Sequence, residues 1–156
     1  MTAAQAGVSL ASVRYSLPQP YRDIEHTADV GVEVEGTSPR EALARLVLAQ
    51  TSLLTGGAPV EVRREERCRA GPGSPASMAI SILRELLFRF ATERVLAAAC
   101  EVVALDPEQG AEVIVALGPF DPDRHAEGLD LKAVTWHQAL FEETGGSWRA
   151  RVVFDI

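Results

Sequence analysis

No apolar run in this sequence of 156 residues approaches the roughly 18 residues that a membrane-spanning helix needs. Residues 1–20 carry a single charge, at Arg14, and lack the basic start, apolar middle and cleavage site of a secretory signal. We therefore expect a cytoplasmic protein without a membrane contact. Residues 1–20 are interpreted as a flexible N-terminal extension.

The sequence also lacks a surplus of positive charge, because its formal net charge at pH 7 is -7. Broad, charge-driven binding to nucleic acid needs a basic surface that releases counterions from the phosphates. We therefore expect no direct nucleic-acid binding, whereas a basic protein partner would match this charge.

Cysteine and histidine are scarce. Cys68 and Cys100 are the only cysteines and have no C-x-x-C spacing, which favours small core residues in a reducing cytosol over a disulfide. The three histidines, His26, His125 and His137, have no H-x-x-x-H spacing, which argues against a histidine-rich zinc site.

Common catalytic motifs are absent as well. The sequence has no phosphate-binding G-x-x-x-x-G-K-[ST], no G-x-G-x-x-G after a strand and no G-x-S-x-G. The segment from Asp121 to His125 fits a turn at least as well as a metal loop. We therefore do not expect the chain to be an enzyme by itself.

The patterns that are present predict a single α+β domain, with two helices packed on a largely antiparallel sheet. Serine followed by proline starts each helix, at Ser38 and at Ser74, and Gly56 ends the first. The sequence pattern also predicts six strands, which span residues 30–35, 60–69, 101–105, 112–117, 129–142 and 148–155. A hairpin turn is expected at Gly145-Gly146, and a bulge or break is expected inside the long fifth strand.

Two acidic groups lie at strand ends that are far apart in the sequence. Asp29 opens the first strand in phase with Glu33 and Glu35, and Asp155 ends the last strand beside Ile156. The phase forces neither carboxylate inward, so both fit solvated strand-end acids. If the two strands were neighbours, the carboxylates would need a cation or a proton between them, and clustered oxygen ligands suit Ca²⁺ or Mg²⁺.

Residues 132–137 form a second unusual segment. In strict alternation Lys132 shares a face with Val134 and Trp136, while His137 lies on the other face. The lysine fits either a rim residue whose charge reaches solvent or a cation placed beside an acidic cluster.

Three segments together resemble the archease family: residues 26–31 (His-Thr-Ala-Asp-Val-Gly), 132–137 (Lys-Ala-Val-Thr-Trp-His) and 148–156 (Trp-Arg-Ala-Arg-Val-Val-Phe-Asp-Ile). They occur in that family's order and at its spacing. The resemblance covers residues 21–156 and leaves only the N-terminal extension outside.

This resemblance implies an activating cofactor of RtcB-type RNA ligases, which use GTP and divalent metal to join RNA ends in tRNA splicing or RNA repair. Archease-like proteins promote guanylylation of the ligase histidine and support multiple turnover. The resemblance implies a divalent metal, Ca²⁺ or Mg²⁺/Mn²⁺, whose ligands match Asp29, Asp155 and the main-chain or terminal oxygens of Ile156. His26, Lys132 and His137 match further motif positions and are assigned supporting or partner-contact roles.

Two other classes of function remain open at this point. A metal-dependent phosphoesterase would use the same acids and turn over without a partner. In a chaperone or scaffold protein, the acidic motifs would be incidental to the function.

Overall fold

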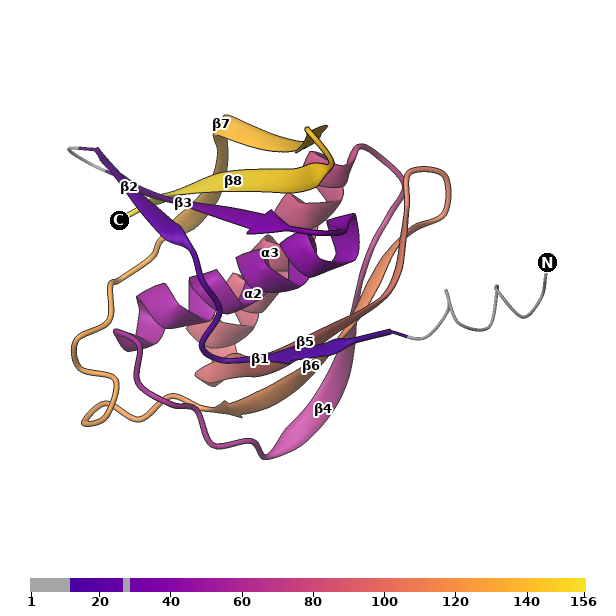
Figure 1. Cartoon of the computed structure of the whole chain (residues 1–156). Coiled ribbons are helices and arrows are strands. Elements are labelled where there is room, and N and C mark those ends of the chain that lie inside the picture. Colours follow the sequence, from indigo (N-terminus) through magenta and orange to yellow (C-terminus); the bar gives the residue numbers. More distant parts are fainter. Residues whose placement is uncertain (1–11, 27–28) are drawn as a thin grey trace.

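Two antiparallel sheets enclose two helices in a computed structural model that describes residues 12–26 and 29–156. Figure 1 shows both helices lying between the sheets, so the layers run sheet, helix pair, sheet. The predicted α+β class is confirmed, with the strands divided between two sheets. Neither described helix is long and apolar enough to cross a membrane.

The first sheet has the strand order β1-β5-β6-β4. Its strands are β1 (Arg14–Ser16), β4 (Arg64–Ala70), β5 (Val95–Asp106) and β6 (Gly110–Pro119). β1 lies inside the predicted flexible extension, yet it pairs with β5, and Leu17 N donates a hydrogen bond to Ala98 O at 3.1 Å. For residues 14–17 the prediction of flexibility is therefore wrong, because main-chain pairing fixes them to the sheet. Residues 1–11 of that extension lie outside the described residues.

The second sheet has the order β2-β3-β8-β7, so the last strand is an inner one. Its strands are β2 (Arg22–His26), β3 (Asp29–Gly36), β7 (Ala133–Thr144) and β8 (Ser147–Asp155). The predicted hairpin turn at Gly145-Gly146 is confirmed, and both glycines adopt positive φ. The predicted bulge or break is present as a register irregularity, since the pairing of β7 with β8 shifts between Thr135 and Leu140.

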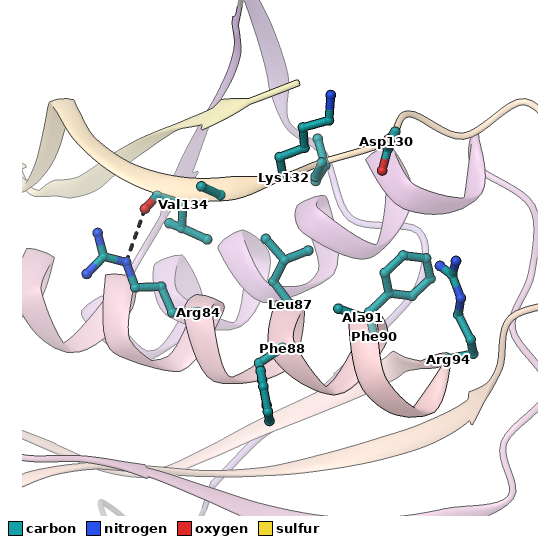
Figure 2. A pocket seen from close by; sticks show the side chains of 11 residues that line it. Arg84, Leu87, Phe88, Phe90, Ala91, Arg94, Asp130, Lys132 and Val134 are labelled. Atoms are coloured by element: carbon teal, nitrogen blue, oxygen red, sulfur yellow. Dashed lines mark hydrogen bonds between the residues drawn. The ribbon is translucent and has the colours of Figure 1, made fainter.

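Both helices begin where the sequence predicts. They are α2 (Pro39–Thr55) and α3 (Pro75–Glu93), and the Ser38 and Ser74 hydroxyls accept hydrogen bonds from main-chain N–H groups three residues later. α2 ends at Gly56, whose φ of 68° suits glycine. α3 lies along β7, and Arg84 Nε donates to Val134 O at 3.1 Å, as Figure 2 shows.

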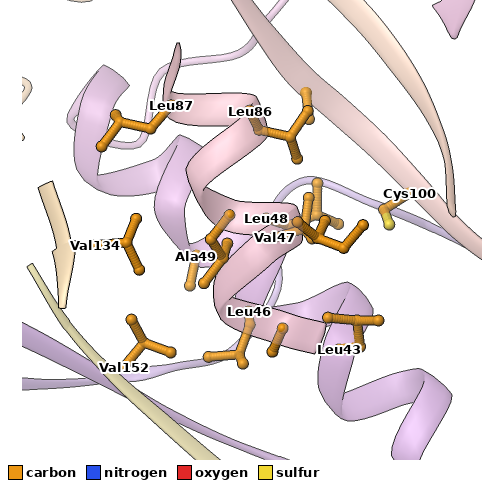
Figure 3. Packing of buried hydrophobic residues seen from close by; sticks show 14 of the residues in the cluster. Leu43, Leu46, Val47, Leu48, Ala49, Leu86, Leu87, Cys100, Val134 and Val152 are labelled. Atoms are coloured by element: carbon orange, nitrogen blue, oxygen red, sulfur yellow. The ribbon is translucent and has the colours of Figure 1, made fainter. Parts of the chain in front are cut away.

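The core surrounds α2. Every residue from Ala42 to Thr55 except Arg45 is buried, because one sheet covers each side of the helix pair. Figure 3 shows Val134 and Val152 of the second sheet on one side of the helices and Cys100 on the other. Cys100 and Cys68 are both buried free thiols, which confirms the prediction of core cysteines.

Candidate metal centre

Asp29 and Asp155 are direct cross-strand partners. β3 and β8 pair antiparallel, and the register sets the Cα of Asp29 opposite that of Asp155. Residues directly opposite each other in an antiparallel pair send their side chains to the same face, with Cβ atoms about 5 Å apart. The structure therefore brings together two acids that are distant in the sequence.

The two carboxylates differ in their surroundings. Asp155 is exposed, and the adjoining Ile156 is 44% exposed. Asp29 is half-buried, and its Oδ1 is a buried oxygen without a hydrogen-bond partner among the described residues. A buried polar atom in that state costs free energy unless something else binds it. The unsatisfied oxygen lies on the half-buried member of an acidic pair, where a bound cation would satisfy it.

The described side chains alone do not complete a metal site. No three His, Cys, Asp or Glu side chains within residues 12–24 and 29–156 gather closely enough to hold a metal ion. A cation at the acidic pair would therefore need further oxygen ligands besides the two carboxylates. Such an all-oxygen set fits Ca²⁺, Mg²⁺ or Mn²⁺ better than a softer metal.

Lys132 fixes the end of β8 through its main chain. Its N–H donates to Asp155 O at 2.8 Å, and the next residue, Ala133, is the register partner of Asp155 on β7. The Lys132 side chain is exposed and forms no ion pair with a carboxylate of the described residues. The lysine is thus next to the acidic pair in the fold, with its charge at the rim.

The two motif histidines lie at different distances from the acidic pair. His26 is the main-chain register partner of Asp29 in β2, and its side chain lies outside the part of the chain that the structure describes. His137 lies in the β7 bulge, where its N–H donates to Thr135 Oγ1 at 3.2 Å, and its side chain is exposed. The same bulge leaves Trp136 53% exposed, because it breaks the alternation that would have placed Trp136 with the buried Val134.

A buried ion cluster on the same face was missed by the sequence analysis. Glu33 is only 5% exposed, although its phase predicts a polar face, because Arg151 and Arg22 cover it from the two neighbouring strands. Burial raises the pKa of Glu33. The hydrogen bond from Arg151 and the charges of Arg151, Arg22 and Arg149 outweigh burial and hold the pKa below its ordinary value of 4.5.

His125 is structural. It is 3% exposed, its Nδ1 accepts from Asp121 N at 2.9 Å, and its Nε2 lies 2.8 Å from Pro59 O, to which it can donate. With both ring nitrogens used, the imidazole is not free to bind a metal. The interpretation of residues 121–125 as a turn is therefore confirmed over the metal loop.

The fold and the acidic pair define a small α+β protein with two sheets around two helices and two carboxylates on paired strands. Residues 21–156 match the model of the Archease protein family (MTH1598/TM1083), so the chain belongs to the archease family. The Protein archease of Methanopyrus kandleri is 35% identical over 139 residues, which cover 88% of this chain and 99% of that relative. The Protein archease of Methanosarcina mazei is 30% identical over 139 residues, which cover 87% of this chain and 95% of that protein.

Solved structures share this fold. The solution structure of protein 1598 from Methanobacterium thermoautotrophicum superposes with a TM-score of 0.72 at 25% identity, covering 87% of this chain and 98% of that one. A crystal structure of an archease from Thermotoga maritima, described as a possible chaperone, superposes with a TM-score of 0.56 at 22% identity, covering 90% and 98%. The second likeness concerns the fold alone.

Proposed function

We propose that this chain activates an RtcB-type RNA ligase and that its acidic pair binds a divalent cation. The observation that supports the proposal most directly is the register pairing of Asp29 with Asp155, together with the buried Asp29 Oδ1, which has no hydrogen-bond partner among the described residues. The chain itself would carry out no catalysis. It would promote guanylylation of the ligase histidine and allow repeated turnover, in tRNA splicing or RNA repair.

The residues present fit such a cation. The carboxylates of Asp29 and Asp155 and the main-chain or terminal oxygens of Ile156 would hold it, and the cation would supply positive charge for phosphate oxygens of a nucleotide. The main-chain bond from Lys132 N to Asp155 O holds the end of β8 beside β7. This bond keeps the second carboxylate in place opposite Asp29.

Charge would favour the encounter with the ligase. The chain has a net charge of -7, and a nucleotide-binding pocket that handles GTP needs positive groups for the phosphates. An acidic protein is drawn toward such a basic surface, with a rate that falls as salt is added. Asp155 and Ile156 are exposed, so the end of β8 would be accessible to that pocket.

Guanylylation of the cognate ligase tests this proposal. Asp29→Asn and Asp155→Asn should reduce the stimulated rate at least tenfold, because each substitution weakens an oxygen ligand, at a cost of about 1.4 kcal/mol per factor of ten. Glu35→Gln is the matched control, since Glu35 is an exposed acid on the same face of β3 as Asp29. Folded Asn variants that stimulate the ligase as well as the control would refute the cation mechanism.

The two rival functions give different results in partner-free assays. A phosphoesterase would hydrolyse a phosphodiester with Mg²⁺ or Mn²⁺ and no ligase, and it would lose that activity in Asp29→Asn. A chaperone of the kind suggested for the Thermotoga maritima archease would suppress aggregation of an unfolded protein equally well in the wild type and in Asp29→Asn.

A further inference from the structure

A groove of about 520 Å³ runs between α3 and the chain that enters β7. Its apolar part includes Leu87, Ala91 and Val134, and its rim includes Phe88, which is 62% exposed. Figure 2 shows Arg84 and Arg94 at opposite ends of the groove, with Leu87 and Ala91 between them. Among the described residues, Asp130 is the only carboxylate that lines it.

Unpaired positive charge is concentrated here. Of the 15 lysine and arginine side chains, ten form ion pairs with carboxylates of the described residues. The other five are Arg40, Arg84, Arg94, Arg124 and Lys132, and three of these five line the groove. The groove is therefore a positively charged surface on a chain whose net charge is -7.

One kind of contact orients each of the two groove arginines. It leaves guanidinium N–H groups without a hydrogen-bond partner among the described residues. Arg84 uses Nε for Val134 O, and no other bond from its guanidinium to a described residue is present. Arg94 lies over the rings of Phe90 and Phe120, with its Cζ 4.8 and 5.6 Å from the two ring centroids. A guanidinium positioned in this way can still bind a carboxylate through two parallel N–H groups.

The spacing of the charges indicates the shape of the ligand. Arg84 and Arg94 are ten positions apart on and just after α3, which at 1.5 Å per residue is about 15 Å. An extended peptide covers that distance in about five residues. Beyond Arg94 the groove meets a second hollow of about 220 Å³, which shares Phe90, Arg94 and Asp130 with it. A single small anion would not reach both arginines.

We propose that this groove binds an extended segment of a protein partner, with acidic residues at Arg84 and Arg94 and apolar side chains between them. The apolar strip would exclude water from the middle of the contact, while the two arginines fix the register of the segment. The groove lies beside the acidic pair, because its lining residues Lys132 and Ala133 adjoin Asp155, but neither acid of the pair lines it. Its existence does not depend on a cation or on the ligase.

The test uses a fluorescein-labelled peptide whose acidic residues flank a short apolar stretch, with fluorescence anisotropy as the readout. The double variant Arg84→Glu/Arg94→Glu should weaken binding at least tenfold, and Phe88→Ala, which removes an exposed side chain, about fivefold. Arg124→Glu, which has half the charge change of the double variant, is the charge control, because Arg124 has no ion pair with a described carboxylate and lies outside the groove; its binding should stay within about twofold. Added salt should weaken binding by the wild type.

Two further probes distinguish other ligands. A peptide with Gln and Asn in place of Glu and Asp should bind more weakly, and oligouridylate should not compete. The proposal is overturned if the acidic peptide does not bind, or if Arg84→Glu/Arg94→Glu and Phe88→Ala bind it like Arg124→Glu. Competition by oligouridylate would also overturn it and assign the groove to RNA.

In the wild type, amide resonances of Phe88 and Ala91 should shift with the acidic peptide, and unchanged resonances would place its binding elsewhere.

Discussion

Glu33 and Arg151 lie directly opposite each other on β3 and β8, and two nitrogens of the guanidinium, Nε and Nη2, donate to Glu33 Oε1 at 2.9 and 2.7 Å. Arg22 reaches the other carboxylate oxygen from β2 at 2.5 Å. One buried acid thus connects three adjacent strands of the sheet that carries the acidic pair. The interaction links the stability of this sheet to pH.

Glu33→Gln should destabilise the protein at neutral pH by about 2 kcal/mol, because the two arginines lose a charged acceptor. The pKa of Glu33 is lowered in the folded chain, so its contribution is present above the unfolded pKa and is lost as pH falls through the folded pKa. Urea unfolding of wild type and variant should therefore show a stability difference that shrinks below about pH 4.5. An equal difference at pH 7 and pH 3 would contradict this assignment.

Asp29→Asn should separate cation binding from folding. Without divalent metal the variant should be as stable as the wild type or slightly more stable, because the substitution removes repulsion between the paired acids. Ca²⁺ or Mn²⁺ at a hundredfold excess over the Kd should stabilise the wild type by about 2.7 kcal/mol and the variant by much less. Thermal unfolding with added metal and with EDTA measures both effects, and Glu35→Gln should respond to metal like the wild type.

His125→Ala should cost about 2–4 kcal/mol in unfolding free energy, since Asp121 N and Pro59 O both lose a buried partner. His137→Ala removes an exposed side chain and should stay within about 0.5 kcal/mol of the wild type. Denaturant titration of the two variants compares a structural histidine with a surface one. Similar losses in both would show that the His125 contacts contribute little.

Gly128→Ala should be strongly destabilising. A Cβ at this position would lie 1.9 Å from Leu54 O, so the loop after His125 could no longer approach the last turn of α2. Gly71→Ala is the control, because a Cβ there would meet no atom within 4 Å. We expect a loss of about 3 kcal/mol or more for Gly128→Ala and almost none for Gly71→Ala, measured by thermal unfolding.

The helices could be predicted from the sequence because their signals are local. Ser38 and Ser74 cap them, proline follows each serine, and Gly56 supplies the left-handed residue that ends α2. Each signal depends on neighbours within one or two helical turns, so no knowledge of the tertiary fold was needed. The hairpin at Gly145-Gly146 was predictable for the same reason.

Pairing between distant strands was not predictable in this way. The period-two pattern placed Asp29, Glu33 and Glu35 on one face, but it could not show that Arg151 and Arg22 would bury the middle one. The pairing of Asp29 with Asp155 followed from the family resemblance and not from strand phase. The groove beside α3 could not be predicted from the sequence, because its charged residues come from two segments that only the tertiary fold brings together.

The position of β8 inside its sheet makes the acidic pair a property of the completed fold. β8 lies between β3 and β7, so the strand that carries Asp155 also joins the β2–β3 hairpin to the edge strand. Until it inserts, the sheet is two unconnected pieces and Asp29 has no acid opposite it. A cation that needs both carboxylates would therefore discriminate between finished and unfinished molecules, and a partner that responds to that cation would engage only chains whose last strand is in place.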